Sequence, residues 1–309
     1  MTKLNLSVII CAHNPRKDYL EQALQALKTQ SIPQDLWELL LIDNASDVIL
    51  ASEVDLEWHS NARHVREETL GLTPARLRGI QEVSAEILVF VDDDNVLDID
   101  YLKTALKIGE DSPFLGAWGG QIQPEFEAPP PGWTKPYWWM LALREFDRDQ
   151  WSNLTDAWNT IPCGAGLCVR HNVAQRYSEL VRSDEKRMGL DRKGKQLTSC
   201  GDLDLAITSH DFNLGTGQFP ALKLTHLLPE GRFQESYLLK LAEANAYSSP
   251  VLESFRGKLP TPPIPLSWRG KWRDRYHRWR MNPRERRFRK AFERGRSLAL
   301  EELLGSRYS

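Results

Sequence analysis

Three consecutive carboxylates, Asp92, Asp93 and Asp94, directly follow the apolar segment Ile87–Val91. A short continuous apolar run predicts a strand that is buried on both faces of a sheet. Carboxylates crowded at the edge of a low-dielectric core repel one another, and a cation relieves that repulsion. Mg²⁺ or Mn²⁺ suits the position, because these ions bind carboxylates together with substrate phosphates. The alternative is a polar loop that merely caps the strand and a following helix.

The composition is that of a globular chain with room for a sizeable core. The 309 residues are 41% hydrophobic and carry a formal net charge of −2, so the whole molecule has no general attraction to nucleic acid. No apolar run approaches the roughly 18 residues of a membrane span, and residues 1–5 do not resemble a signal peptide. The four cysteines contain no Cys-x-x-Cys pair, which indicates reduced thiols. We therefore expect a cytoplasmic protein.

Apolar strands alternate with amphipathic helices along the first half of the chain. Strands are predicted over residues 6–11, 39–42 and 62–66, besides 87–91, and helices over 19–30 and 101–108. A further helix is predicted to start at Thr73 and Pro74, with Thr73 as its N-cap. This alternation predicts an α/β fold with a mainly parallel, Rossmann-like sheet flanked by helices.

Polar residues follow three of these strands, at 12–14, 43–44 and 92–94. In open α/β sheets, ligands bind beyond the carboxyl ends of the strands, so we expect the three segments to converge on one crevice. Strand ends also need turn residues, which is a sufficient explanation for Asn44 but a poor one for three adjacent carboxylates.

Two nucleotide-binding motifs can be set aside. No Gly-x-Gly-x-x-Gly follows the first strand, which argues against a dinucleotide-binding domain. Residues 189–196 approach a Walker A loop, but Gln196 stands where Ser or Thr should hold Mg²⁺, and no buried strand precedes them. We interpret this segment as a mobile charged loop.

A series of short motifs between residues 4 and 237 resembles glycosyltransferase family 2, the inverting nucleotide-sugar enzymes with a GT-A fold. Their order and spacing carry the resemblance, and they lie at residues 7–14, 37–46, 71–80, 91–94, 164–166, 201–205 and 224–237. The resemblance implies a GT-A domain over residues 1–245, with a donor half at about 1–125 and an acceptor half at about 126–245. Residues 246–309 would form a linker and a basic, aromatic, helical C-terminal extension.

The resemblance also assigns roles at the donor side. It implies that Asp43 binds the nucleobase, Asp92 the ribose, and Asp94 a Mn²⁺ or Mg²⁺ ion, with His226 as a second metal ligand. A metal and basic side chains would stabilise the charge that builds on the diphosphate leaving group. The predicted donor-binding residues are Ala12, Asn14, Asp43, Arg76, Asp92, Asp93 and Arg232, and the predicted metal-binding residues are Asp94, His226 and Asp92.

The family's catalytic base, an Asp at a helix start, matches Asp202. The Glu that usually precedes it is replaced by Gly201, which puts acceptor positioning in question. The alternative is that Asp202 is only an N-cap. Aromatic rings at 133–139 and the small residues at 164–166 indicate an acceptor region. The predicted acceptor-binding residues are Trp133, Gly164, Ala165 and Asp204.

The C-terminal part changes composition. A Pro-rich stretch at 260–265 is predicted to be a linker, and residues 268–296 are dense in Arg interleaved with Trp and Phe. This segment could lie on an anionic membrane surface, or it could pack on the catalytic domain or on a second subunit. It contains no recognised nucleic-acid-binding module, and the oligomeric state is not predicted.

These observations together predict a metal-dependent inverting glycosyltransferase. It would move a sugar from a nucleoside-diphosphate sugar, with a UDP-sugar favoured, to a hydroxyl of a saccharide or lipid-linked acceptor in surface polysaccharide or glycolipid synthesis. One alternative is a non-catalytic sugar- or nucleotide-binding protein on the same fold, as Gly201 suggests. Another is a sugar nucleotidyltransferase, although residues 11–15 are not the Gly-rich basic loop that such an enzyme needs.

Overall fold

The structure is a computed structural model that describes residues 4–194, 196–261 and 267–305. The chain divides into two compact units. The first unit comprises Met1–Lys195 and Gly201–Glu230, and the second comprises Gln196–Cys200 and Gly231–Ser309. The predicted boundary at residue 245 falls inside a helix of the second unit, Glu235–Ser254.

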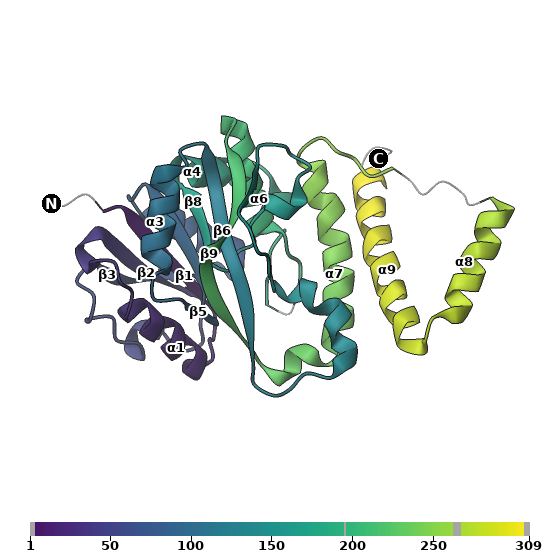
Figure 1. The fold of residues 1–309 in the computed structure, drawn as a ribbon, viewed down its shortest axis with the longest axis horizontal. Coiled ribbons are helices and arrows are strands. Elements are labelled where there is room, and N and C mark those ends of the chain that lie inside the picture. The colour runs from purple at the N-terminus through teal and green to yellow at the C-terminus, as the bar shows by residue number, and fades with distance from the viewer. Residues whose placement is uncertain (1–3, 195, 262–266, 306–309) are drawn as a thin grey trace. The chain divides into compact units, whose positions relative to one another are not determined.

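A nine-stranded sheet forms the centre of the first unit (Figure 1). The strand order is β3-β2-β1-β4-β8-β6-β9-β5, and β7 pairs with β9. The strands are β1 (Leu6–Ala12), β2 (Trp37–Asn44), β3 (Ala62–Glu67), β4 (Ile87–Asp92), β5 (Asn95–Leu97), β6 (Leu115–Phe126), β7 (Gln150–Ser152), β8 (Leu167–Arg170) and β9 (Gly215–Leu228).

The four predicted strands are confirmed as the parallel half of this sheet. β1 pairs in parallel with β2 and β4, and β2 pairs in parallel with β3. Alternate residues of β1 point to opposite faces, so Val8 and Ile10 join a core cluster with Leu20 and Leu24 of the first helix, whereas Ile9 lies against Gly79. Because these strands are buried on both faces, their sequences are nearly continuous apolar runs.

Helices cover the two faces of the sheet. α1 and α3 share the cluster that contains Val8, while α2 packs on the opposite face through Gly79, which leaves no room for a side chain against Ile9 and Ile42. In the first unit the α-helices are α1 (Lys17–Lys28), α2 (Leu72–Glu82), α3 (Tyr101–Asp111), α4 (His171–Arg182), α5 (Glu185–Met188) and α6 (Gly201–Ile207). Single 3₁₀ segments are η1 (Gln34–Leu36), η2 (Leu50–Ser52), η3 (Gly132–Leu141), η4 (Trp158–Thr160), η5 (Thr208–Phe212) and η6 (Glu230–Phe233).

The start of α2 differs from the prediction. The helix begins at Leu72 and its N-cap is Gly71, whose φ of 142° is a conformation that residues with a side chain rarely adopt. The prediction of Thr73 as N-cap is therefore wrong. The Thr73 hydroxyl instead donates a 3.3 Å hydrogen bond to Asp191 Oδ2. The Thr73 hydroxyl, which the local sequence predicted to cap the helix, is hydrogen-bonded instead to a buried carboxylate from a distant segment.

Two antiparallel pairings bring distant segments to the end of β4. β5 pairs with β9, which places Asn95 opposite His226. β8 pairs with β4, which places Leu167 opposite Phe90 and so brings the 164–166 segment toward the residues that follow β4. The acidic triplet, the histidine and the glycine-rich segment therefore meet through sheet topology.

The second unit contains the helices α7 (Glu235–Ser254), α8 (Trp268–Arg280) and α9 (Pro283–Gly305). α7 and α9 pack closely, since a Cβ added at Gly295 of α9 would lie 2.0 Å from the carbonyl oxygen of Glu243. Arg294 forms an ion pair with Glu243 at 2.7 Å. Most of the predicted Pro-rich linker, residues 262–265, lies outside the described residues. No helix within the described ranges is long and apolar enough to cross a membrane.

Candidate active site

Asp94 and His226 form a buried pair beyond the end of β4. The exposed fractions of the two residues are 8% and 5%, and Asp94 Oδ2 lies 3.3 Å from His226 Nε2. The Asn95 amide donates a 3.1 Å hydrogen bond to Asp94 Oδ1. The β5–β9 pairing fixes this geometry, because it sets Asn95 directly opposite His226. The two residues that the resemblance assigns to one metal ion are therefore neighbours, and their metal-binding role stays a prediction.

Asp92 shares this environment. It is half-buried, like Asp93, and its backbone N–H lies 3.4 Å from Asn95 Oδ1. Burial raises the pKa of Asp92, and the Asp94 carboxylate raises it further, whereas Arg76 and His226 oppose the shift. Asp92 therefore lies within electrostatic reach of Asp94, Arg76 and His226, and a bound cation would relieve the repulsion between the two carboxylates.

The donor set of the pair fits a divalent cation that is completed by substrate. Within residues 4–194, 196–261 and 267–305, no group of three or more His, Cys, Asp or Glu side chains converges closely enough to hold a metal ion. Asp94 and His226 offer one carboxylate oxygen and one imidazole nitrogen. Mg²⁺ and related ions are commonly held by one or two protein ligands with phosphates and water filling the other positions. The pair fits that arrangement and does not fit a site built from protein alone.

Asp202 lies in the first turn of α6 and is held by two backbone donors. Its Oδ2 accepts a 2.6 Å hydrogen bond from the N–H of Gly164, and its Oδ1 accepts a 2.9 Å bond from the N–H of Leu203. The side chain is half-buried, so solvent and a substrate can reach it. The predicted base and the predicted acceptor residue Gly164 are therefore neighbours.

Arg76 of α2 lies beside the same two groups. A Cβ added at Gly164 would be 2.8 Å from Arg76 Nη2 and 3.2 Å from Asp202. Arg76 Nη1 forms a buried 2.6 Å ion pair with Asp191. Burial alone would lower the pKa of Arg76, but the carboxylates of Asp191, Asp202 and Asp92 raise it, so the guanidinium stays charged. The absence of a side chain at residue 164 gives the cation room to lie next to the predicted base.

Asp191 belongs to the site but was not predicted from the sequence. It is 6% exposed and accepts hydrogen bonds from Thr73, Arg76 and the N–H of Gly201. The interpretation of residues 189–196 as a mobile charged loop is wrong for Asp191. The one signal for it was Gly201, which stands where the family resemblance implies a carboxylate.

Asp204 has a different environment from Asp202. It is 1% exposed, and both of its oxygens accept hydrogen bonds from Arg187 Nη1, at 3.0 and 2.8 Å. This buried ion pair ties α5 to α6. The acceptor role of Asp204 stays a prediction, and its position in the structure is that of a residue that supports the helix carrying Asp202.

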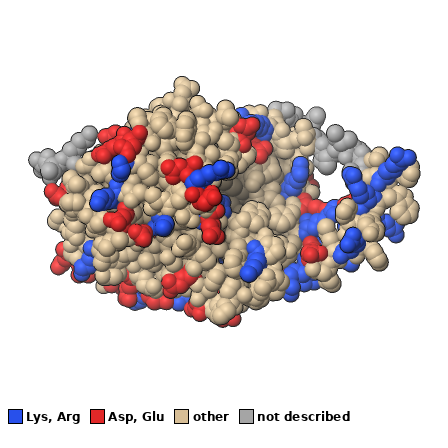
Figure 2. All heavy atoms as spheres, in the orientation of Figure 1, with Lys and Arg blue, Asp and Glu red and all other residues tan. Residues whose placement is uncertain are grey.

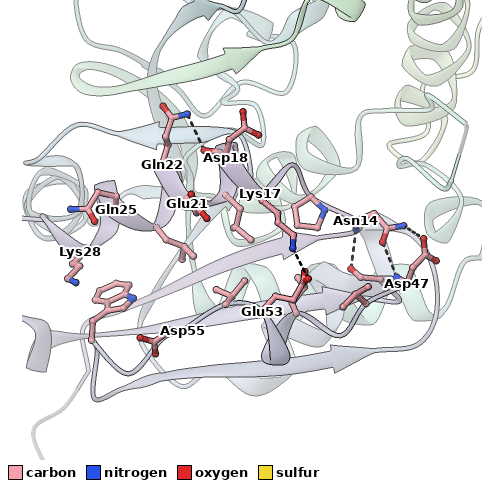
Figure 3. Close-up of a pocket in the computed structure, with 18 residues that line it drawn as sticks. Asn14, Lys17, Asp18, Glu21, Gln22, Gln25, Lys28, Asp47, Glu53 and Asp55 are labelled. Atoms are coloured by element: carbon pink, nitrogen blue, oxygen red, sulfur yellow. Dashed lines mark hydrogen bonds and ion pairs between the residues drawn. The ribbon is translucent and has the colours of Figure 1, made fainter.

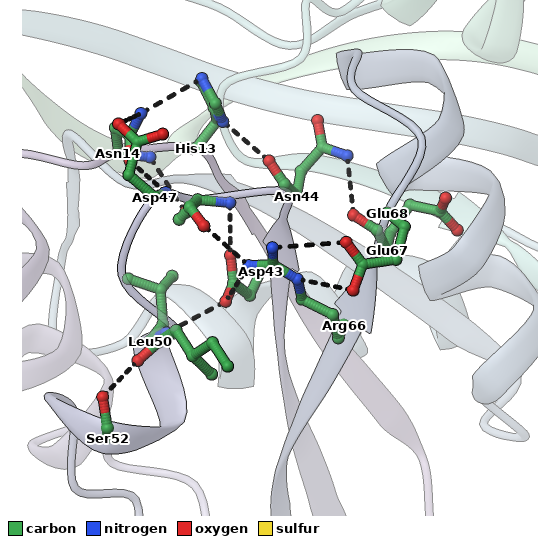
Figure 4. Close-up of polar contacts among 12 residues, drawn as sticks. His13, Asn14, Asp43, Asn44, Asp47, Leu50, Ser52, Arg66, Glu67 and Glu68 are labelled. Carbon is green, nitrogen blue, oxygen red and sulfur yellow. Dashed lines mark hydrogen bonds and ion pairs between the residues drawn. The ribbon is translucent and has the colours of Figure 1, made fainter.

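The ends of β1 and β2 form a dense polar network (Figure 4). Asp43 Oδ1 accepts from the Ser46 N–H at 3.1 Å, and its Oδ2 accepts from the Leu50 N–H at 3.0 Å and from Arg66 at 2.8 Å. Burial would raise the pKa of Asp43, but these hydrogen bonds lower it below the ordinary value. The carboxylate thus holds the loop after β2 in place, and its contact with a nucleobase stays a prediction.

Ala12 and Asn14 precede this network. Ala12 is buried, and Asn14 has a left-handed φ of 46°. The Asn14 amide donates to Asp47 at 3.0 Å, and its Oδ1 accepts from the Asp47 N–H at 2.9 Å (Figure 4). These bonds bring the loops after β1 and β2 together at the carboxyl ends of the strands, where the predicted donor residues were expected to converge.

The predicted acceptor residues differ in exposure. Trp133 is half-buried and packs edge-on against Tyr137 with ring centroids 6.4 Å apart, whereas Trp139 is 52% exposed. Ala165 is 4% exposed, so its contribution to the site is its small volume. Arg232 belongs to η6 of the second unit, whereas the other predicted donor-binding residues belong to the first unit. Its contact with the donor phosphates stays a prediction.

A large cavity lies apart from the carboxylate site. Its volume is about 1060 Å³, and it runs between α1 and the segment 46–58 (Figure 3). Lys17 and Glu53 face each other across it and form a 2.7 Å ion pair. Asn14 and Asp47 line one end, but Asp92, Asp94 and Asp202 are not among its lining residues. This cavity is therefore not where the candidate chemistry lies.

The family model for glycosyl transferase family 2 matches residues 7–170, more than half of the chain. A curated relative is the glucosyl-dolichyl phosphate glucuronosyltransferase of Haloferax volcanii, which is 19% identical over 145 residues. That match covers 46% of each protein, so the chain spans about half the length of this relative.

Solved structures of S. aureus TarS are similar in fold. One matches with a TM-score of 0.51 and 15% identity, covering 79% of this chain and 39% of TarS. TarS 1–349 in complex with UDP-GlcNAc matches with a TM-score of 0.50 and 14% identity, covering 79% and 66% of the two chains. These likenesses and the sheet order confirm the predicted GT-A type of fold. With the match of the family model, they confirm the predicted resemblance: the chain belongs to glycosyl transferase family 2.

Proposed function

We propose that this protein is a metal-dependent inverting glycosyltransferase that moves a sugar from a UDP-sugar to a hydroxyl of a saccharide or lipid-linked acceptor. The observation that carries the proposal is the arrangement at the end of β4. Asp92 lies within electrostatic reach of the Asp94–His226 pair and of Arg76 there, and Arg76 in turn lies within reach of the half-buried Asp202. Such a site offers a place for a diphosphate and a separate carboxylate that can accept a proton.

Two relatives support the choice of substrate. TarS 1–349 is described in complex with UDP-GlcNAc, and the Haloferax volcanii relative is a glucuronosyltransferase that acts on a glucosyl-dolichyl phosphate, as its name states. The first supports a UDP-sugar donor, and the second supports a lipid-linked acceptor for the proposed reaction. Surface polysaccharide or glycolipid synthesis is the setting in which such acceptors are used.

In the proposed reaction, Asp202 removes the proton from the acceptor hydroxyl. Hydrogen bonds from Gly164 and Leu203 fix its carboxylate, and each oxygen keeps a further lone pair for the substrate. Arg76 faces the same space and places positive charge near the leaving group. Attack from the face opposite the departing diphosphate inverts the anomeric carbon.

Asp94 and His226 would hold the Mn²⁺ or Mg²⁺ ion, with Asp92 close by. When bound, the ion stabilises negative charge on the diphosphate. The carboxylate and the imidazole are oriented before any ligand arrives, because Asn95 donates to Asp94 and the β5–β9 register sets His226 opposite Asn95.

We also propose that the basic C-terminal segment brings the enzyme to an anionic membrane, where a lipid-linked acceptor would lie. α8 and α9 are rich in Arg, and Lys and Arg side chains gather over the part of the second unit that these helices form (Figure 2). Negative lipid headgroups attract such segments.

A screen of nucleotides by thermal shift tests the donor proposal. At a hundredfold excess over Kd, a ligand stabilises the folded state by about 2.7 kcal/mol. For a domain of this size that corresponds to roughly 5–10 °C in Tm. We expect UDP and UDP-sugars to give such a shift with Mn²⁺ and a smaller one with EDTA, and ADP and GDP to give less.

Two results would redirect the assignment. A shift with a nucleoside triphosphate and a sugar phosphate, but not with a UDP-sugar, would favour a sugar nucleotidyltransferase. A shift with a UDP-sugar that is never followed by release of UDP in the presence of acceptors would favour a non-catalytic binding protein.

A further inference from the structure

Helix α8 exposes an unusual set of aromatic side chains. No residue of this helix is buried. Four of its rings are largely open to solvent, with exposed fractions of 68% for Trp268, 67% for Trp272, 54% for Tyr276 and 74% for Trp279. Leaving large apolar rings in water is unfavourable, so a concentration of them on one short helix indicates a surface that is covered in use.

The four rings lie on one face of the helix. With about 100° between successive residues, the rings at positions 268, 272, 276 and 279 fall within an arc of about 80°. We call this arc the aromatic face. Three cations flank it on each side, namely Lys271, Arg275 and Arg278 on one side and Arg269, Arg273 and Arg280 on the other.

The opposite face of α8 is the one that meets α9. Asp274 lies about 200° from the centre of the aromatic face. Its Oδ1 forms a 2.6 Å ion pair with Arg289 of α9, and its Oδ2 forms an ion pair with Arg278. The connection to the rest of the second unit thus uses the back of the helix and leaves the aromatic face unoccupied.

We propose that the aromatic face of α8 is the membrane-contacting element, lying flat in the headgroup region of an anionic bilayer. Trp and Tyr rings favour that region because they combine an apolar body with a polar edge. Cations on both flanks would then reach lipid phosphates. A nucleic acid would satisfy the cations, but it offers no apolar layer for three tryptophans in one line.

Vesicle binding by the full chain tests this proposal. The probes are vesicles of phosphatidylcholine alone and of phosphatidylcholine with phosphatidylglycerol, with co-sedimentation and Trp fluorescence as readouts. We compare Trp272→Ser/Trp279→Ser with the matched control Trp151→Ser/Trp158→Ser, which removes two exposed tryptophans of the first unit. A third variant, Arg269→Gln/Arg273→Gln/Arg280→Gln, removes one flank of cations.

We expect binding to the anionic vesicles that falls at high salt, with little binding to phosphatidylcholine alone. The α8 tryptophan variant should lose binding at least tenfold, and the arginine variant by roughly fivefold for each cation removed. The control variant should bind like wild type. Equal binding by the two tryptophan variants, no binding by wild type, or self-association or RNA binding that depends on the same tryptophans would each overturn the proposal. Catalytic activity is not needed for this readout, so failure here leaves the proposed reaction untouched.

A second, independent observation concerns Gly201, where the family resemblance implies a Glu. A Cβ added at Gly201 would lie 2.1 Å from Asp191 Oδ2 and 2.5 Å from its Cγ. The carboxylate of Asp191 therefore fills the space that a side chain at residue 201 would enter. It arrives from the segment between α5 and α6, and it accepts the N–H of Gly201 at 3.1 Å.

This carboxylate joins α2 to the start of α6. Asp191 accepts hydrogen bonds from Thr73 and Arg76 of α2 at 3.3 and 2.6 Å. Gly201, which it also binds, precedes Asp202 in the first turn of α6. Arg76 in turn lies beside Gly164, whose N–H holds Asp202. One buried acid is thus connected to the proposed base through two separate routes.

We infer that Asp191 is a positioning residue that supplies, from another part of the chain, the carboxylate missing at position 201. It would orient Arg76 toward the donor and fix the turn that carries Asp202. This inference rests on the proposed function, because it assigns Asp191 a part in the same site. It also explains how the site can be catalytic although Gly201 departs from the family pattern.

Relocating the carboxylate tests the inference. Asp191→Ala removes the acid, and Gly201→Asp introduces one where Asp191 already stands, so each single variant should lose transfer by about 10–100-fold. In Asp191→Ala/Gly201→Asp the clashing carboxylate is gone. The new Cγ would lie about 1.5 Å from the Cβ position. Asp191 Cγ lies 2.5 Å from the same position, so the relocated carboxyl would sit at least about 1 Å from the old one. The double variant should recover at least tenfold over Asp191→Ala in kcat, with its pH profile restored.

Three measurements on each variant separate the outcomes, namely Tm, affinity for UDP with Mn²⁺, and transfer. A double variant that recovers Tm but neither UDP affinity nor transfer would show that Asp191 is structural only and overturn the inference. Failure of wild type to transfer any sugar would contradict the proposed function instead. In that case the positioning role of Asp191 would be tested by UDP affinity alone. The role is supported if affinity is lost in the single variants and regained in the double variant, and contradicted otherwise.

Discussion

Replacement of Asp202 by asparagine is expected to lower sugar transfer by about 10²–10⁴-fold, the usual contribution of a general base. Asparagine is nearly the same size as aspartate and can still accept hydrogen bonds from the N–H groups of Gly164 and Leu203. Its amide cannot take a proton at neutral pH. Folding and affinity for the donor should therefore stay close to those of wild type while kcat falls.

Asp204→Asn is the matched comparison, because it makes the same chemical change two residues away. Asp204 is buried and paired with Arg187, so removing its charge leaves a buried guanidinium without its carboxylate. Breaking such a pair typically costs about 3–5 kcal/mol, which would lower Tm by roughly 10 °C. We expect Asp202→Asn to change turnover at constant Tm, and Asp204→Asn to change Tm first.

Parallel assays of transfer, UDP binding and thermal stability on both variants check this contrast. Near-wild-type transfer by Asp202→Asn, together with an inactive but folded Asp204→Asn, would assign the base to Asp204. Full transfer by both would place the catalytic carboxylate elsewhere and would mean that residues 201–205 are wrongly matched to the family motif.

The sequence alone was sufficient for the parallel half of the sheet. β1, β2 and β4 are buried on both faces, so their apolar runs are continuous and their ends are marked by abrupt changes to polar residues. The pairing of Asp94 with His226 was implied by the family resemblance. It could not be worked out from local patterns, because it depends on the register between β5 and β9, more than a hundred residues apart.

Asp191 shows where local reasoning stops. The three residues that follow it in sequence are Arg, Lys and Gly, which are typical of an exposed loop, whereas Asp191 itself makes long-range contacts with Thr73 and Arg76. The same contacts explain the wrong N-cap prediction for Thr73. Asp43 is a milder case, because the sequence places it correctly at the end of β2 but cannot show that Ser46, Leu50 and Arg66 already occupy its oxygens.

Asp94→Ala is expected to abolish the dependence of UDP binding on Mn²⁺. Asp94 provides the buried carboxylate of the pair with His226. A metal ion held by these two side chains would lose one of its two protein ligands in this variant. Changes in the groups that merely orient a ligand commonly cost 10–100-fold in metal affinity, so loss of the ligand itself should cost on the order of 100-fold or more. UDP affinity in EDTA should be the same for wild type and variant.

Calorimetric titration of UDP with Mn²⁺ and with EDTA measures this effect, and Asp98→Asn is the matched control. Asp98 is exposed and lies four residues further along the same segment, so its loss of charge should leave the response to Mn²⁺ unchanged. His226→Ala should resemble Asp94→Ala, because the two side chains would share one ion. Equal UDP affinity of wild type in Mn²⁺ and EDTA would contradict the metal role altogether. A normal Mn²⁺ response in Asp94→Ala that is lost in Asp92→Ala would transfer that role to Asp92, whose pKa is raised by burial and, in addition, by the negative charge of Asp94.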